Sequence, residues 1–248
     1  MRIRLLGATT LAVLVGAIPA RSNPSGPPED PGAAMVERFL AREDEPLASY
    51  NGHRCLEATN ARFKASGLMQ VTVTLTPERG FEWTVIREQG SSYIRNKVLR
   101  KALDSEREMV ARGDPARAAL TLANYGIVST PSSGGGPEDL GTLRLLLTPK
   151  RSDLLLVRGS VLVSDPEGDL LEVRGRLAKN PSWWTTAVEV VRTYGRVGGV
   201  RVPVTMSSTA QVRIAGRSQF RMTSTFEQVN GRPTGTTVTA DSCTTMTI

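Results

Sequence analysis

The sequence predicts an α+β protein that is mainly antiparallel β, built as a curved sheet covered by amphipathic helices. The most informative stretch is residues 183–230, where three strands with alternating apolar residues are joined by two short glycine turns. Gly198-Gly199 has the composition of a two-residue hairpin loop, because glycine accepts positive φ angles at little cost. A second observation is the helical period of residues 91–123, which interrupts an otherwise β-patterned chain.

Residues 1–20 have the pattern of a secretory signal peptide. Arg2 and Arg4 precede an apolar stretch at 5–18, which is shorter than the roughly 20 residues that a membrane-spanning helix needs. We interpret the segment as a signal cleaved after Ala20, and an uncleaved membrane anchor is the alternative. No cysteine stands near this site for lipid attachment. We therefore expect an exported, soluble protein beyond the inner membrane.

Charge and cysteine content narrow the function classes. The net charge of +7 falls to +5 without Arg2 and Arg4, and the remaining basic residues are spread along the chain. This pattern argues against a nucleic-acid partner, which would require clustered Lys and Arg, and leaves a weaker attraction to anionic lipid headgroups. Cys55 and Cys243 are the two cysteines. In an exported protein they are expected to form a disulfide, with two unpaired thiols as the alternative.

The remaining elements follow in chain order. Residues 21–32 are rich in Pro, Gly and Ser and predict a flexible spacer, and one domain then covers residues 33–248. A short amphipathic helix follows, with its apolar stripe formed by Met35, Val36, Phe39 and Leu40. A hairpin is predicted across the turn at residues 77–80. Its apolar positions are Met69, Val71, Val73, Leu75, Phe81, Trp83 and Val85.

The helical insertion at 91–123 is predicted to contain one helix of about five turns, ending near Gly113, and a second, shorter helix from Asp114-Pro115 through Ala123. Ile94, Val98 and Leu103 lie on the apolar face of the first helix. A Ser- and Gly-rich loop follows at 129–136. Strands are then expected near 143–147, 154–163 and 170–177, before the C-terminal meander that ends near Val229.

The sequence offers no convincing catalytic or metal-binding motif. His53 is the only histidine, the cysteines are far apart, and neither a GxSxG motif nor a phosphate-binding glycine loop is present. We interpret His53 as an ordinary residue near the start of a strand. Glu57 and Glu82 fit solvent-facing strand positions. We therefore expect no catalytic residue, no metal and no cofactor, and we do not expect an enzyme.

Two interpretations of the apolar positions remain open. If the helices cover the sheet fully, these residues form only a core. If the sheet is too large for the helices to fill, they line a cavity that would accept acyl chains, because each buried methylene contributes about 0.8 kcal/mol. Trp183-Trp184 would then lie at its rim. Ile94, Val98 and Leu103 would form the lid. The candidate lining residues are Val71, Val73, Leu75, Phe81, Trp83, Val85, Leu143, Leu145, Leu147, Val202, Val204, Met206, Phe220 and Met222.

Three segments of the meander, residues 188–194, 198–204 and 215–222, carry a further indication. They contain an aromatic strand end at Tyr194, then Gly199 with Pro203, and the last strand closes on Asn230-Gly231. In these features the chain resembles the LolA/LolB superfamily of bacterial envelope proteins, most closely over residues 140–231. It departs from the known carriers of that superfamily in the helical insertion and in its two cysteines.

The resemblance implies an unclosed β-barrel with helices as a lid, which holds lipid or the acyl chains of lipoproteins. Without a lipid-attachment cysteine, it implies a soluble periplasmic carrier that makes transient contact with a membrane. The alternative function is an envelope sensor or adaptor, in which the same fold binds an envelope protein partner.

Overall fold

The computed structural model describes residues 31–113, 115–130, 141–235 and 243. The expected signal peptide at 1–20 lies outside the described residues, as do most of the expected spacer and most of the loop at 129–136. Residues 31 and 32, the last two of the expected spacer, belong instead to the first helix.

The elements follow one another in a simple order. They are α1 (Pro31–Ala41), β1 (Tyr50–Asn60), β2 (Ala65–Thr76), β3 (Gly80–Gly90), α2 (Ser92–Ile94), the π-helical segment η1 (Arg95–Leu99), α3 (Arg100–Arg112), the 3-10 turn η2 (Pro115–Ala118), β4 (Tyr125–Ser129), β5 (Thr142–Pro149), β6 (Val157–Ser164), β7 (Leu170–Leu177), β8 (Thr185–Val197), β9 (Val200–Val212), β10 (Gly216–Val229) and β11 (Arg232–Pro233).

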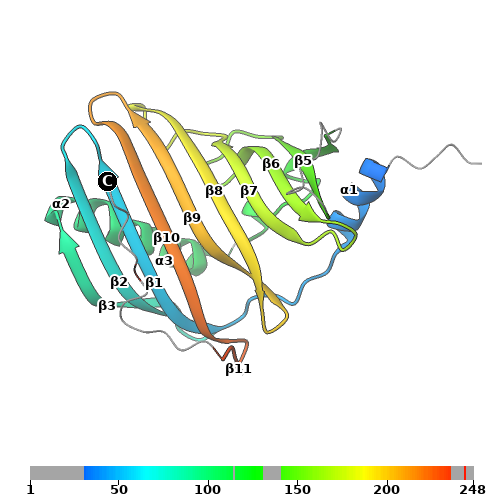
Figure 1. Cartoon of the computed structure of the whole chain (residues 1–248), viewed down its shortest axis with the longest axis horizontal. Coiled ribbons are helices and arrows are strands. Elements are labelled where there is room, and N and C mark those ends of the chain that lie inside the picture. The colour runs from blue at the N-terminus through cyan, green and yellow to red at the C-terminus, as the bar shows by residue number, and fades with distance from the viewer. Residues whose placement is uncertain (1–30, 114, 131–140, 236–242, 244–248) are drawn as a thin grey trace, which may run out of the picture.

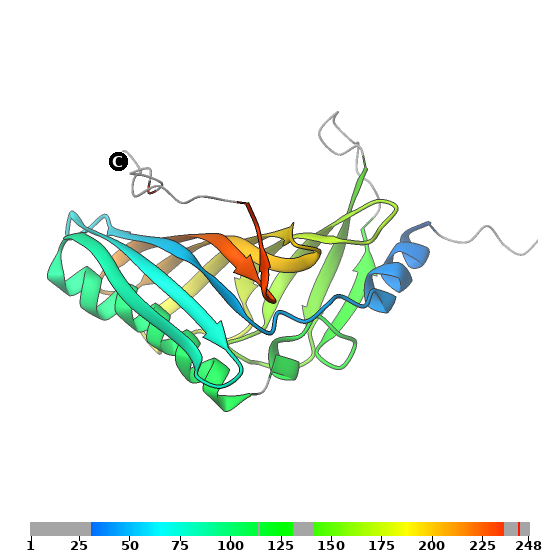
Figure 2. The same cartoon turned by 90° about the horizontal axis from the view of Figure 1, so that it is seen from below.

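One antiparallel sheet dominates the molecule (Figure 1). Within the described residues its strand order is β3-β2-β1-β10-β9-β8-β7-β6-β5-β4, with β11 paired to β10. Pairing of β1 with β10, from Tyr50 opposite Val229 to Asn60 opposite Ser218, joins the N-terminal hairpin to the C-terminal meander. In this part of the chain β3 and β4 are the free edges, so the sheet is curved and unclosed (Figure 2). The predicted fold class is confirmed.

The glycine turns behave as the sequence predicts. Val197 pairs with Val200, so Gly198 and Gly199 form a two-residue loop, and both have positive φ angles of 59° and 87°. This turn conformation strongly favours glycine, which explains why a Gly-Gly pair separates β8 from β9.

The helical insertion forms one continuous rod, α2–η1–α3. The Ser91 hydroxyl accepts a hydrogen bond from the Ile94 amide at its start, and Gly113, with a φ of 64°, ends it as predicted. The expected second helix through Ala123 is wrong, because only the four-residue turn η2 forms. There the Asn124 side-chain amide donates to the carbonyls of Ala116 and Ala119, both at 2.8 Å, and so satisfies groups that a longer helix would have bonded.

Both hydrophobic clusters lie on the concave face of the sheet. Across it, Met206, Arg192, Val173, Val161 and Leu145 form one register row, so these side chains share a face. The first cluster packs strands β1, β2, β3, β9 and β10 against the rod. The second packs strands β4 to β7 against α1. Figure 2 shows the rod and α1 at opposite ends of this concave side.

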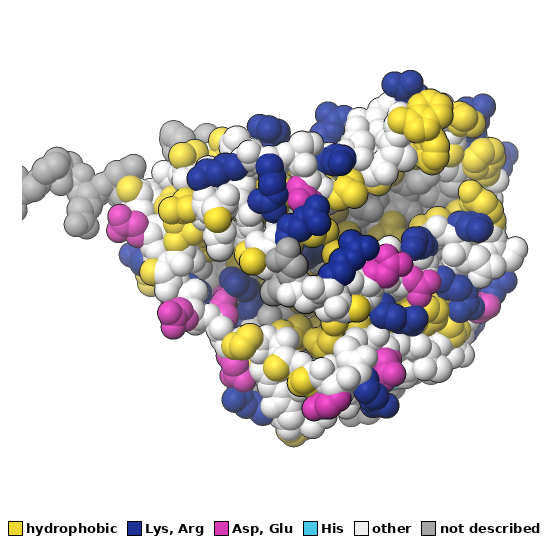
Figure 3. Space-filling view, turned by 180° about the vertical axis from the view of Figure 1, so that it is seen from behind, with side chains coloured by type: hydrophobic (Ala, Val, Ile, Leu, Met, Phe, Trp, Pro, Cys, Tyr) yellow, Lys and Arg dark blue, Asp and Glu magenta, His cyan; other side chains and the backbone are white. Residues whose placement is uncertain are grey.

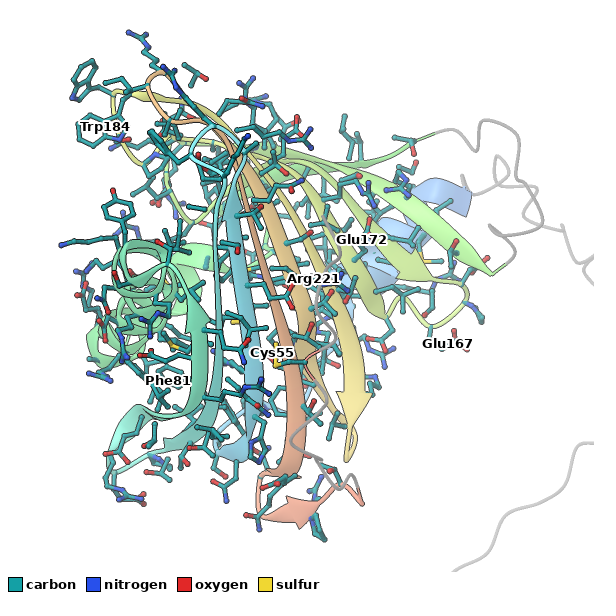
Figure 4. The ribbon with its side chains drawn as sticks, turned by 60° about the vertical axis from the view of Figure 1, so that its left-hand side comes forward. Cys55, Phe81, Glu167, Glu172, Trp184 and Arg221 are labelled. Carbon is teal, nitrogen blue, oxygen red and sulfur yellow. A yellow bond between two sulfur atoms is a disulfide. The ribbon has the colours of Figure 1, made fainter. Side chains whose placement is uncertain are left out.

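A disulfide joins Cys55 of β1 to Cys243, as the sequence predicts. Cys55 is an odd-numbered residue of β1, whose even-numbered residues are buried, so its side chain points to the convex face. Figure 4 shows the bond on that face. Cys243 is thereby attached to the outer surface of the sheet.

Candidate ligand cavity

A cavity of about 830 Å³ opens at one end of the half-barrel. It lies between α2–η1 and the inner faces of β1, β9 and β10, and the β1–β2, β7–β8 and β9–β10 connections form its mouth. Figure 3 shows the molecule hollowed at this end, with hydrophobic and basic side chains around the opening. The volume falls within the ~300–1,000 Å³ of typical small-molecule sites.

The lining is mostly apolar. Its apolar members are Ala58, Phe63, Ala65, Tyr93, Ile94, Val98, Ala102, Pro181, Trp184, Met206, Ala210, Val212, Ala215 and Phe220. Its polar members are Thr59, Asn60, Ser91, Lys97, Thr185, Ser208, Ser218 and Gln219. Of the described residues around this cavity, Lys97 alone carries a charge. Such a lining suits a hydrocarbon body with a polar or anionic end.

Small side chains explain why the half-barrel is hollow at this end. Ala58, Ser208, Ala210 and Ser218 occupy inward strand positions around the cavity, and each leaves space that a larger residue would fill. Deeper in the sheet the inward positions carry bulky, fully buried residues. These are Leu56, Val202, Phe226 and Val229, together with Leu99 and Leu103 from the rod. The interior is therefore filled at one end and open at the other.

Beneath the cavity floor a buried ion pair crosses the concave face. Arg54 of β1, 4% exposed, donates to both carboxylate oxygens of Glu106 on α3 at 2.5 and 2.9 Å, and to the Tyr50 hydroxyl at 2.9 Å. Burial opposes the Arg54 charge, but hydrogen bonding to Glu106 and its negative charge raise the pKa of Arg54 above its usual value. Burial also raises the pKa of Tyr50. The pair fixes α3 over the sheet through two charge-assisted hydrogen bonds.

Two further contacts hold the rod over the cavity. Glu88 of β3 binds Arg95, and it also accepts a hydrogen bond from Arg100 at 2.6 Å. Gly67 of β2 allows α2 to approach closely, because a Cβ there would lie 2.8 Å from a methyl carbon of Ile94. The wall formed by Ile94 and Val98 is thus fixed against the sheet by packing and by charge.

The described residues outside this cavity offer less to a ligand. A second hollow of about 660 Å³ beside α3 has a mixed lining that includes Arg79, Glu82, Trp83 and Arg107. No group of three or more His, Cys, Asp or Glu residues is placed to hold a metal within the described ranges. Of the helices that the structure describes, none has the length and apolar character needed to cross a bilayer.

No family model matches the chain, and no curated protein matches it. Three solved structures are similar in fold. A LolA superfamily protein from Nitrosomonas europaea is 12% identical, with a TM-score of 0.38, over 78% of this chain and 91% of that chain. A putative outer membrane lipoprotein-sorting protein domain from Vibrio parahaemolyticus is 11% identical, with a TM-score of 0.37, over 79% and 92%. A DUF1329 family protein from Desulfovibrio piger gives the same identity, TM-score and coverage as the Vibrio domain.

One of the three, the Nitrosomonas europaea protein, is named for the superfamily that the sequence resembles. At 11–12% identity the likeness concerns the fold alone.

The structure divides the sequence-predicted site residues among three environments. Met206, Phe220, Ile94 and Val98 line the cavity. The first core cluster, or its partly buried margin, contains Val71, Val73, Leu75, Phe81, Trp83, Val85, Leu103, Val202 and Met222. Leu143, Leu145 and Leu147 belong to the second cluster, under α1. Val204 is partly buried on β9. Figure 4 shows Phe81 beside the rod, well below Trp184 at the mouth.

The sequence pattern does not identify several lining residues. Ala58, Ala65, Ala102 and Ala210 are small, whereas the lining predicted from the sequence consists of bulky apolar residues. Phe63 and Tyr93 lie in a turn and at a helix start, outside the alternating strand patterns. A run of small residues at inward strand positions, as in Ser208 and Ala210, is the signal that would have identified the hollow end.

Proposed function

We propose that this protein is an exported periplasmic carrier that binds a lipid, or the acyl chains of a lipoprotein, in the cavity under α2–η1. The observation that carries the proposal is an apolar cavity of about 830 Å³ that opens at one end of the half-barrel. The lining favours a hydrocarbon ligand, because the apolar residues of the cavity outnumber the polar ones.

The energetics support a reversible complex. A chain that buries about ten methylenes gains about 8 kcal/mol, which corresponds to micromolar binding before the loss of ligand freedom is counted. Lys97 of η1, in the cavity lining, is placed to attract an anionic headgroup or carboxylate. Such an affinity suits a carrier that must release its cargo.

The disulfide supports an oxidising compartment. Bonds such as Cys55–Cys243 persist in secreted and periplasmic proteins and are rare in the cytosol. Together with the signal-like residues 1–20, this favours the periplasm as the place of action.

The test uses the chain without residues 1–20, purified without detergent from a periplasmic fraction. Native mass spectrometry and analysis of a solvent extract should reveal about one acyl lipid per protein. After delipidation, the protein should bind a fluorescent C16 fatty acid in solution. If the protein is lipid-free as purified and does not bind the fluorescent fatty acid, the proposal is overturned.

A further inference from the structure

The turns around the cavity mouth form an exposed surface, which we call the rim. It consists of the β1–β2 turn (61–64), the β7–β8 loop (178–184), the β9–β10 turn with the first residues of β10 (213–217), and Tyr93 of α2. Strand register places the turns together, since Asn60 is opposite both Ala65 and Ser218 while Val212 is opposite Gly216 and Thr185. Two of them touch, because a Cβ at Gly216 would lie 3.6 Å from the Arg62 Cβ.

Large apolar side chains are exposed on this rim. Phe63, Tyr93, Trp183, Trp184 and Ile214 are between 45% and 74% exposed. The aromatic residues of this set are Phe63, Tyr93, Trp183 and Trp184. Among the described residues, no other aromatic side chain is exposed, so the exposed aromatic rings gather at this end. Trp183 and Trp184 pack edge to face with centroids 5.3 Å apart, so they project as a unit. An exposed aromatic cluster of this kind marks an interaction surface.

The rim is also uniformly basic. Arg62, Lys64, Lys179, Arg213 and Arg217 are exposed, and residues 61–64, 178–184 and 213–217 contain no Asp or Glu. None of these five cations forms an ion pair within the described chain. Their charge is therefore available to an anionic partner.

The opposite end of the half-barrel differs in this respect. There Asp44 lies 2.5 Å from Arg196 and 2.8 Å from Arg201, and Glu45 lies 2.9 Å from Arg232. The basic side chains at that end are neutralised by carboxylates. Unpaired positive charge and exposed aromatic rings thus coincide at the end where the cavity opens.

We infer that the rim docks on an anionic phospholipid bilayer and so holds the cavity mouth at the headgroups. Trp and Tyr favour the membrane–water interface, where their rings meet the acyl boundary and their polar groups meet water. Lys and Arg are attracted to the negative surface potential of anionic lipids, and each strengthens binding by about fivefold. Docking in this orientation gives an acyl chain a path between bilayer and cavity without crossing water. This last consequence rests on the proposed function, whereas the docking itself does not.

Docking is tested by co-sedimentation with vesicles of phosphatidylethanolamine and phosphatidylglycerol, compared with vesicles of phosphatidylcholine alone. We expect binding to the anionic vesicles, with a blue shift of tryptophan emission, and a marked loss of binding between about 0.05 M and 0.5 M salt. Absence of binding to anionic vesicles at low salt would overturn the inference, as would equal binding to both kinds of vesicle.

Two rim variants identify the surface. Arg62→Gln with Arg213→Gln removes two cations and should weaken vesicle binding by roughly 25-fold. Trp183→Ala, at a position 74% exposed, should weaken it by about tenfold and reduce the emission shift. The matched control is Arg158→Gln with Arg221→Gln, which removes the same charge from exposed strand positions away from the rim. If the control loses as much binding as the rim pair, only net charge matters and the assigned surface is wrong.

The same variants separate docking from carriage. Arg62, Arg213 and Trp183 do not line the cavity, so their variants should bind the fluorescent fatty acid in solution as the parent does. Loss of vesicle binding with fatty-acid binding retained supports the rim. A parent protein that binds vesicles but does not bind the fatty acid would support the docking surface and refute the carrier function.

Discussion

Ala210→Leu is the most direct test of the cavity. Ala210 lies on β9 with its side chain in the cavity lining, and leucine would add three carbons to the open space. At about 0.8 kcal/mol per methylene, displacing three methylenes of a bound chain would cost about 2.4 kcal/mol, or roughly 60-fold in Kd. The same carbons fill empty volume in the unliganded protein, so its stability should stay constant or rise.

Titration with a fluorescent C16 fatty acid measures the Kd, and urea unfolding followed by circular dichroism measures the free energy of unfolding. The matched control is Gln211→Leu, which adds a leucine at the next, exposed position on the other face of β9. We expect the control to bind as the parent does. A folded Ala210→Leu protein with an unchanged Kd would refute the assignment of the cavity as the binding site. Ser208→Leu, two residues away on the same face, provides an independent repeat.

Three further predictions concern the forces that hold the fold. Glu106→Ala leaves the Arg54 charge buried and unpaired, so we expect the free energy of unfolding to fall by about 3 kcal/mol. The double variant Arg54→Met/Glu106→Leu removes both charges and should recover much of this loss. A Glu106→Ala protein as stable as the parent in urea would contradict this. Cys55→Ser removes a disulfide between residues 188 positions apart, and the chain-entropy model predicts that the free energy of unfolding falls by about 5 kcal/mol. A thermal melt of the parent protein that a reductant leaves unchanged would argue against this stabilisation. Burial of Asp44 favours its neutral form, but hydrogen bonds from Arg196 and Arg42 and the charge of Arg201 hold its pKa below the usual value. The contribution of Asp44 to the free energy of unfolding is therefore complete above about pH 4 and is lost as the pH falls through its folded-state pKa. Asp44→Asn should accordingly lower the free energy of unfolding by about 1–2 kcal/mol at pH 7, and by progressively less as the pH falls through the folded-state pKa of Asp44. A pH-independent difference between the two unfolding curves would exclude this role.

Local patterns predicted the elements well. Alternating apolar residues and the Gly198-Gly199 pair predicted the C-terminal hairpin, and Gly113 predicted the end of the rod, because each depends on neighbours in sequence. The second helix failed because Asn124, a residue beyond its expected end, bonds the carbonyls that would have continued it.

The location of the cavity could not be predicted in the same way. Ala58, Ser208 and Ser218 come from three strands, and they form one layer only through the register of β1 with β10 and of β10 with β9. The alternating pattern in the sequence predicts that all apolar positions share one surface under two helical covers. In the structure α1 covers strands β4 to β7, which assigns Leu145 and Leu147 to a separate core.

The pairing of β1 with β10 has a consequence for the order in which the chain folds. The first strand hydrogen-bonds to a partner about 170 residues later in the sequence, from Gly216 to Val229. Long-range pairings of this kind form slowly, whereas β1 can pair with its neighbour β2 through a short turn. We therefore expect the hairpin and the meander to form first, and the central seam that joins them to close as a late step of folding.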